Sequence, residues 1–226
     1  MKIAVLGTGT VGPMIAAALS ALGHDVVIGT RDPQATLART QPGATGGAPF
    51  ADWHAANPGI DVATFADAAG RADVVVNATN GAGSLGALTA AGAENLNGKV
   101  LIDIANPLDF SQGFPPSLNP VNTDSLGEQI QRTFPEARVV KTLNTMNAGV
   151  MVDPVSVAGG DHSVFVSGND ADAKAIVSGL LKDFGHRDVI DLGDITTARG
   201  TEMLLPIWLR LWGALGNADF NFKIAR

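Results

Sequence analysis

The sequence predicts an α/β fold in which helices cover both faces of a mostly parallel sheet. Short apolar segments that suit buried strands alternate with longer segments of helical periodicity. This alternation is typical of parallel sheets, because a parallel connection needs a crossover helix. The expected strands lie near residues 2–6, 25–29, 60–64, 73–78, 98–104, 138–142, 162–167 and 187–191. The expected helices lie near residues 10–22, 33–39, 65–71, 84–93, 124–133, 170–184 and 199–216.

A glycine-rich turn joins the first expected strand to the first helix. It has the spacing Gly-x-Gly-x-x-Gly and consists of Gly7, Thr8, Gly9, Thr10, Val11 and Gly12. Gly7 allows the tight turn, Gly9 lets a pyrophosphate approach the backbone, and Gly12 lets the helix pack closely on the sheet. Helix amides and the positive end of the helix dipole then face the phosphates. Strand, turn, helix and second strand in this order predict a Rossmann-type, doubly wound fold that binds a dinucleotide.

The end of the second expected strand indicates which dinucleotide is bound. An acidic residue about 20 residues after the turn would bind the ribose 2′-hydroxyl of NAD. This chain has Thr30 and Arg31 there, and a hydroxyl beside a guanidinium suits a 2′-phosphate. Asp32 follows and would favour a free hydroxyl if the register shifted by one residue. We therefore expect NADP(H) as the cofactor.

Composition narrows the classes of partner and compartment. The chain lacks cysteine, which excludes disulfides, thiol nucleophiles and thiolate metal centres and favours the cytoplasm. With a net charge of −7 and no basic cluster, we expect no nucleic-acid partner. A strand follows the first residue directly, so we expect no signal peptide. The most apolar segment, residues 203–215, is too short to span a bilayer and is interrupted by Pro206 and Arg210, so we expect no membrane partner.

Two connections look irregular. Residues 41–59 are rich in glycine, proline and alanine, with Phe50 and Trp53 as candidate anchors, and residues 106–122 contain four prolines. Long loops of this kind are often lids or binding loops, or simply variable surface.

Polar residues follow three of the later expected strands, in the segments 77–81, 104–107 and 142–147. Sheets of this kind bind ligands at the carboxyl ends of their strands. Lys141, in or at the end of a strand, is expected to be structural or to face a phosphate. His186 is expected in a solvated loop. We name no catalytic residue and no metal site.

With these segments, the Gly23-His24-x-Val26 and Gly29-Thr30-Arg31 sequences resemble the family of NADP oxidoreductases that reduce coenzyme F420, a 5-deazaflavin. The same dinucleotide module occurs in membrane metalloreductases of the STEAP type. The resemblance extends to Thr196–Arg199, to the apolar segment Glu202–Leu215 and to the ending Gly216–Lys223.

This resemblance implies a set of roles. Thr8 to Gly12 would hold the pyrophosphate, and Thr30 and Arg31 the 2′-phosphate. The nicotinamide would be bordered by Ala78, Thr79, Asn80, Ala105, Asn106, Pro107 and Asn144. We also expect the pocket for a small-molecule acceptor to be formed by Thr145, Met146 and Asn147, with Trp208 and Trp212 added by the apolar terminal helix.

The implied activity is hydride transfer between NADP(H) and F420. Two alternatives remain open at this stage: an NADPH-dependent reductase of a flavin, imine or carbonyl compound, and a non-catalytic NADP-binding sensor.

The chain is expected to divide by role. Residues 1–142 would form the dinucleotide-binding domain. Residues 143–226 would form a C-terminal α/β extension for the acceptor and for dimerisation, packed with the first part as one unit. The terminal helix is apolar over most of its circumference, which indicates burial. Either the chain's own core or a homodimer interface would provide that burial, and we expect the homodimer.

Overall fold

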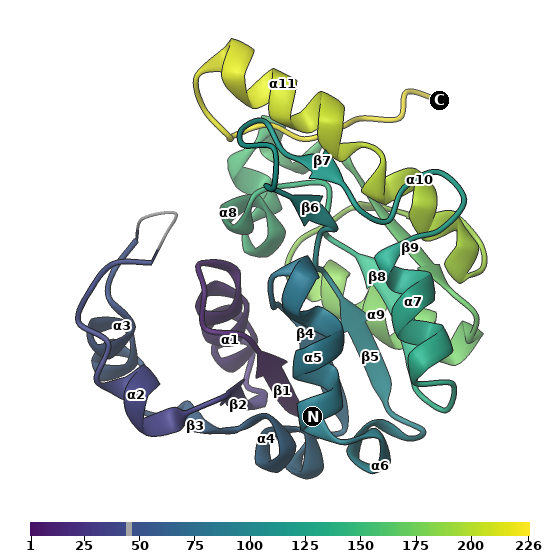
Figure 1. The fold of residues 1–226 in the computed structure, drawn as a ribbon. Coiled ribbons are helices and arrows are strands. Elements are labelled where there is room, and N and C mark those ends of the chain that lie inside the picture. The colour runs from purple at the N-terminus through teal and green to yellow at the C-terminus, as the bar shows by residue number, and fades with distance from the viewer. Residues whose placement is uncertain (44–46) are drawn as a thin grey trace.

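The computed structural model describes residues 1–43 and 47–226 and shows one eight-stranded sheet with helices on both faces (Figure 1). The strand order is β10-β9-β8-β5-β4-β1-β2-β3, and β8 and β9 pair antiparallel while the other neighbours pair in parallel. The chain therefore reverses its direction of winding beside β1, as expected for a doubly wound fold. These strands are β1 (Lys2–Leu6), β2 (Asp25–Thr30), β3 (Asp61–Thr64), β4 (Val74–Asn77), β5 (Val100–Asp103), β8 (Arg138–Thr142), β9 (Ser163–Gly168) and β10 (Asp188–Asp191).

Alternation along the buried strands divides the core into two layers. In β1, Ile3 and Val5 point to one face, while Ala4 and Leu6 point to the other. The first face is covered by α1 (Val11–Ala21), α8 (Ala148–Val152) and α9 (Ala171–Asp183). The second is covered by α4 (Phe65–Arg71), α5 (Gly81–Ala91), α6 (Ala93–Leu96) and α7 (Leu126–Thr133). The sheet and the first layer both continue past residue 142, so the C-terminal residues extend the same core.

The expected irregular connections contain short elements. The first follows α2 (Pro33–Leu37), which lies where a helix was expected, and contains a helix that the sequence analysis missed, α3 (Phe50–Ala56). Phe50 is buried, as expected of an anchor. Residues 44–46 of that connection lie outside the described part of the chain. We call residues 31–43 and 47–59 the arm. The second connection contains the two-stranded ladder of β6 (Leu108–Asp109) and β7 (Ser117–Leu118).

Two expected helices are each divided in two. The helix expected near 84–93 begins earlier and is interrupted at Gly92, whose φ of +90° separates α5 from α6. The helix expected over 199–216 consists of α10 (Ala198–Glu202) and α11 (Leu205–Leu215). Pro206 lies in the first turn of α11 and cannot donate a hydrogen bond to a preceding turn, which explains the break. Short 3-10 helices at Pro154–Ser156, Ala158–Gly160 and Ile195–Thr197 complete the fold.

The terminal helix is not buried in its own chain. It lies beyond the sheet layers, at the top of Figure 1, and Leu205 is its one buried residue. Ile207, Trp212 and Leu215 are 47%, 41% and 54% exposed. These exposed fractions show that the expectation of burial in the chain's own core is wrong. The sequence left this alternative open because a helical pattern does not reveal which surface covers the helix. In the described part of the chain, no helix is long and apolar enough to cross a membrane.

Candidate functional site

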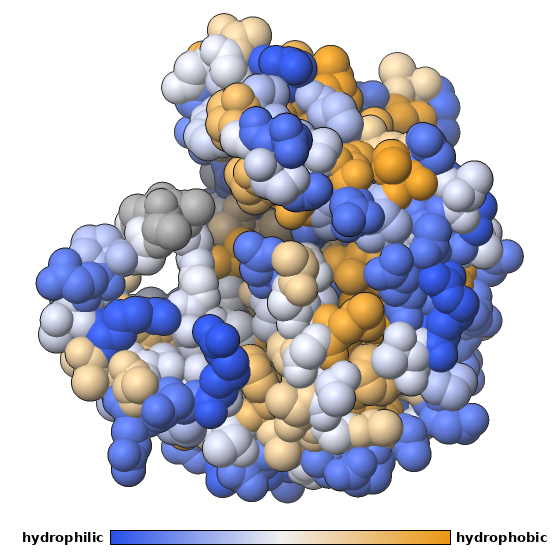
Figure 2. Space-filling model, in the orientation of Figure 1, coloured by the Kyte–Doolittle hydropathy of each residue, from blue (hydrophilic) through white to orange (hydrophobic). Residues whose placement is uncertain are grey.

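A cavity of about 880 Å³ opens at the carboxyl end of the sheet, beside β1 where the winding reverses. Figure 2 shows the molecule hollowed between the arm and the main body. Eight of the expected cofactor residues line this cavity. They are Gly7, Thr8, Gly9, Thr30, Arg31, Ala78, Thr79 and Asn80. Its other wall is made of small residues of α5, including Gly83, Gly86, Ala87 and Ala90.

The glycine-rich turn has the geometry that a pyrophosphate site requires. A Cβ on Gly9 would meet no described atom within 4 Å, so the backbone is open to a ligand. A Cβ on Gly12 would lie 2.0 Å from the carbonyl oxygen of Gly7. Gly7 has a φ of +125°, and its Cβ would lie 2.5 Å from the oxygen of Ala78. Gly9 therefore leaves space for the ligand, whereas Gly7 and Gly12 allow close packing of the turn, which fits a dinucleotide.

The end of β2 supports the expected register. Thr30 is the last residue of the strand and is buried, and its hydroxyl bonds that of Thr36 at 2.8 Å. Arg31 follows, is exposed and lines the cavity. The carboxylate of Asp32 accepts the amide of Ala35 at 2.9 Å and caps α2. The acid therefore has a structural partner, and the guanidinium of Arg31 is the group next to the strand end.

Arg39 is a site residue that the sequence analysis missed. It lines the same cavity and also a second one of about 190 Å³, with which the first shares Thr8 and Gly9. Its guanidinium donates to the hydroxyl and to the carbonyl oxygen of Thr8. Arg39 belongs to no motif, and only a long-range contact across 31 residues brings it to the turn.

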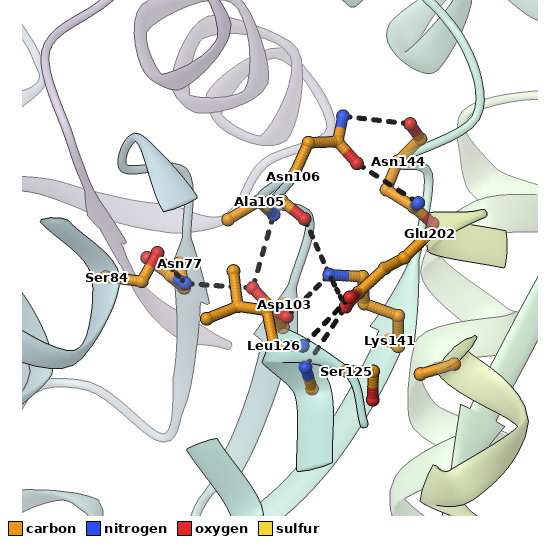
Figure 3. A network of polar contacts seen from close by, with 12 residues as sticks. Asn77, Ser84, Asp103, Ala105, Asn106, Ser125, Leu126, Lys141, Asn144 and Glu202 are labelled. Atoms are coloured by element: carbon orange, nitrogen blue, oxygen red, sulfur yellow. Dashed lines mark hydrogen bonds and ion pairs between the residues drawn. The ribbon is translucent and has the colours of Figure 1, made fainter. Parts of the chain in front are cut away.

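At the ends of β4 and β5, a buried polar network begins at the cavity wall (Figure 3). Thr79 donates through its hydroxyl to the side-chain oxygen of Asn77 at 2.6 Å and bonds Ser84 at 3.0 Å. The amide of Asn77 donates to Ser84 at 3.1 Å and to Asp103 at 2.8 Å. Asp103 also accepts the backbone amide of Ala105 at 3.2 Å. The ends of β4 and β5 are thus joined by the side chains of Asn77 and Asp103.

Lys141 is the centre of this network and is fully buried. Its ammonium lies 2.8 Å from both Asp103 and Glu202, and it donates to the carbonyl oxygen of Ala105 at 2.6 Å. Burial by itself would lower the pKa of Lys141, but the neighbouring carboxylates outweigh it and raise that pKa above its usual value. The lysine therefore stays charged, and its ammonium contacts three groups of the protein itself.

Glu202 connects the network to α7 and α10. Its carboxylate accepts the first amides of α7, from Leu126 at 2.8 Å and Gly127 at 3.1 Å. The N-terminus of that helix thereby compensates part of the excess negative charge. Arg199, one turn earlier on α10, pairs with Glu128 of α7. The sequence analysis named Arg199 and Glu202 as parts of the family pattern, but not their partners on α7 and β8.

The segments after β5 and β8 are locked together. The side chain of Asn106 donates to the carbonyl oxygen of Asn144 at 3.0 Å, and Asn144 donates back to the side chain of Asn106 at 3.1 Å. Leu143 has a φ of +60°, a strained value for this residue, at the bend that follows β8. A Cβ on Gly81 would lie 2.0 Å from the oxygen of Asn106, so the segments after β4 and β5 are also in close contact.

The residues expected around the acceptor do not form one surface in the chain alone. Thr145 and Met146 are buried, and Met146 belongs to the core layer that contains α1 and α8. Asn147 caps α8 and donates to the carbonyl oxygen of Ala218. Trp208 and Trp212 lie on α11 with ring centroids 6.0 Å apart. Ala105, Asn106, Pro107 and Asn144 lie on the neighbouring strand ends, beyond the cavity described above.

His186 differs from its expectation as a solvated side chain. It is buried, and its ring bonds the carbonyl oxygen of Met151 at 3.0 Å. Burial lowers its pKa, so the neutral form is favoured. Within the described residues, no group of three or more His, Asp or Glu side chains is placed to hold a metal ion.

Comparison with known proteins identifies the family. The family described as NADP oxidoreductase coenzyme F420-dependent matches residues 2–107. A protein of Arthrobacter sp. FB24, provisionally named an F420-dependent NADP reductase, has a crystal structure with a TM-score of 0.95 to this chain. The two are 73% identical, and the match covers 100% of each. The chain belongs to the coenzyme F420-dependent NADP oxidoreductase family.

More distant members of this family and a larger protein are also similar. The F420-dependent NADP reductase of Methanothermobacter marburgensis is 28% identical over 93% of this chain and 92% of its own. Metalloreductase STEAP3 of Rattus norvegicus is 25% identical over 92% of this chain, which spans 38% of the metalloreductase's length. The family resemblance and the Rossmann-type fold expected from the sequence are therefore confirmed.

Two glycines of the turn give opposite predictions. Gly9→Val places a side chain where the pyrophosphate approaches and should abolish nucleotide binding, measured by titration calorimetry. Its apo-protein melting temperature should stay close to the parent's, because the added Cβ meets no described neighbour. Gly12→Ala should instead lower the melting temperature, because its Cβ overlaps the oxygen of Gly7. A Gly9→Val protein that unfolds like Gly12→Ala would make Gly9 a structural glycine.

The buried lysine should be the most sensitive charged position. Lys141→Met leaves Asp103 and Glu202 without their cation and should cost about 3–5 kcal/mol of unfolding free energy in urea. Lys223→Met removes an exposed pair with Asp161 and should change stability little. Equal losses for the two variants would contradict a central role of the buried cluster.

Proposed function

We propose that the protein is an oxidoreductase that transfers hydride between NADP(H) and coenzyme F420. Family membership supports NADP as the cofactor and F420 as its partner, since both appear in the names of the family and of its relatives. One structural observation carries the proposal. The cavity is lined by the open glycine turn, and Arg31 lies at the end of β2, the position that binds a 2′-phosphate in dinucleotide-binding folds.

The chain's own residues supply binding and orientation. Gly9 and the first amides of α1 would hold the pyrophosphate, and Thr30 and Arg31 the 2′-phosphate. When bound, the cofactor supplies the hydride chemistry. Thr79 and the Asn106–Asn144 pair would border its nicotinamide half. Because partly buried hydrogen bonds hold these side chains, the nicotinamide would meet an ordered wall, which hydride transfer needs for alignment.

We also propose that α11 pairs with its copy in a homodimer, as the exposed apolar side chains on α11 require a covering surface. In Figure 2, orange side chains lie among pale and blue ones over the region of α11. The patch includes Phe114 of the β6–β7 connection, which is 68% exposed and meets the edge of Trp212. In such a pair, Trp208 and Trp212 of one copy would approach the acceptor side of the other.

The remaining expectations are part of the same proposal. A chain without cysteine suits the reducing cytoplasm. Its net charge of −7 disfavours nucleic acid, which leaves a small-molecule acceptor as the partner.

The function is tested by following NADPH oxidation at 340 nm with F420, FMN, an imine and an aldehyde as separate acceptors. We expect F420 to give the fastest turnover, and NADPH to outperform NADH. Arg31→Ala should weaken NADPH by about 1.5–3 kcal/mol and barely affect NADH, because it removes hydrogen bonds to a charged group.

A different outcome would contradict each part of the proposal: the acceptor, the enzymatic activity and the role of Arg31. Turnover with FMN, imine or aldehyde in place of F420 would move the protein to another acceptor. NADPH binding without oxidation by any of the four would favour a sensor. An equal effect of Arg31→Ala on both cofactors would remove Arg31 from the 2′-phosphate site.

The assembly is tested by light scattering at low micromolar concentration. The unmodified protein should have twice the chain mass of 23.1 kDa, and Trp212→Glu should have the mass of one chain. Leu22→Glu is the matched control, because Leu22 is similarly exposed, at 43%, but lies at the end of α1 away from the patch. A monomeric parent, or a dimeric Trp212→Glu, would refute the proposed pairing.

A further inference from the structure

Arg39 connects the arm to the glycine-rich turn. It follows α2, and its own carbonyl oxygen accepts the amide of Ala51 at 3.2 Å, so its backbone is bound to α3. Its side chain reaches the turn and donates to the hydroxyl of Thr8 at 3.3 Å and to the carbonyl oxygen of Thr8. The guanidinium therefore lies between the arm and the turn.

A buried aromatic ring holds this guanidinium in place. Its carbon lies 5.3 Å from the ring centroid of Phe50, within the range of a cation–π interaction. Phe50 is itself buried and packs against Trp53 with centroids 5.2 Å apart. Because the ring is fixed, the position of the charge is also fixed, which favours a ligand-binding role over that of a freely solvated arginine.

The guanidinium has unused hydrogen-bonding capacity. Arginine has five N–H donors, and two of its nitrogens bond Thr8. The third, Nε, is buried and has no hydrogen-bond partner among the described residues. Nor does any described carboxylate lie within 4.0 Å of Arg39, whereas Arg132, Arg199 and Arg226 each have one. A half-buried cation without a counter-ion suits an anionic ligand.

The positions of the two cavities indicate whether Arg39 faces the pyrophosphate or the 2′-phosphate of a dinucleotide. Arg31, at the end of β2, lines the larger cavity but not the smaller one. Arg39 lines both cavities, which share Thr8 and Gly9. The smaller cavity continues along the first turn of α1. Arg39 is thus on the pyrophosphate side of the site, and Arg31 on the side of the 2′-phosphate.

We propose that Arg39 binds the pyrophosphate of the dinucleotide and so supplies affinity that NADP(H) and NAD(H) share, while Arg31 supplies the preference for NADP(H). This inference rests on the proposed function only in assuming that the cavity binds a dinucleotide. It makes a residue of the arm, outside the glycine motif, part of the phosphate site.

The test measures binding to the apo protein by calorimetry, so no turnover is needed. The ligands are NADP⁺ and NAD⁺ together with two fragments: ADP, which has the pyrophosphate, and 2′-AMP, which has the 2′-phosphate. Arg39→Ala should weaken NADP⁺, NAD⁺ and ADP by a similar factor of about 10–100 and leave 2′-AMP nearly unchanged. Arg31→Ala should weaken NADP⁺ and 2′-AMP and spare ADP.

Two further variants separate this role from general effects. Arg71→Ala removes one exposed arginine that pairs with Asp61 outside the cavity, and it should bind all four ligands normally. Arg39→Lys should bind ADP more tightly than Arg39→Ala but less tightly than the parent protein. An ammonium lacks the planar guanidinium that contacts the ring of Phe50 and hydrogen-bonds Thr8 at the same time.

Other outcomes would overturn the inference. If Arg39→Ala lowers the apo melting temperature but binds ADP normally, Arg39 is only a structural tie to Thr8. If it weakens 2′-AMP and NADP⁺ but not ADP, it belongs to the 2′-phosphate site. If the parent protein binds neither dinucleotide, the proposed function fails, which is distinct from both results.

Discussion

The carboxyl edge of the sheet depends on one buried lysine between two carboxylates. Lys141 on β8 joins Asp103 on β5 to Glu202 on α10, residues separated by 38 and 61 positions in sequence. Three charges removed from water are costly, and the cluster persists because each remaining oxygen or proton has a partner. The carbonyl oxygen of Ala105 accepts from the lysine, and the first amides of α7 bond Glu202. Strand ends, helix start and C-terminal segment are therefore held in one arrangement.

The two sides of the cofactor cavity are consequently held by different forces. On the side of β4 and β5, an ion pair and hydrogen bonds connect Glu202 through Lys141 and Asp103 to Asn77 (Figure 3). Asn77 in turn accepts a hydrogen bond from Thr79 at the cavity wall. On the opposite side, the arm is held by the buried ring of Phe50 and by the bonds of Arg39 to the turn. A dinucleotide between them would meet a fixed polar wall for its reacting half. Its phosphates would meet a cationic arm, although the chain as a whole carries a net charge of −7.

The sequence predicts the parts of this arrangement that depend on local pattern. Apolar segments of strand length locate the eight strands, and the spacing of Gly7, Gly9 and Gly12 locates the turn, since each has a steric requirement within a few residues. The partners of Lys141 and the role of Arg39 could not be predicted, because both arise from contacts between distant segments. The terminal helix shows a third limit. Its pattern predicts a surface that avoids water, but Trp212 has the same periodicity whether its cover is the chain's own core or another molecule, and in the chain alone Trp212 is 41% exposed.

Close backbone contacts explain how the starts of α1 and α5 come to lie at the same cavity. The missing side chain of Gly12 brings α1 against the carbonyl oxygen of Gly7, and that of Gly81 brings α5 against Asn106. Both helices therefore begin directly at the edge of the sheet, and Asn80, which caps α5, lines the cavity beside the turn that precedes α1. The partial positive charges of both helix ends face the same region. In the proposed arrangement, Arg31 at the end of β2 would supply the preference for NADP(H), while the open backbone of the turn and the side chain of Arg39 would supply contacts that any dinucleotide shares.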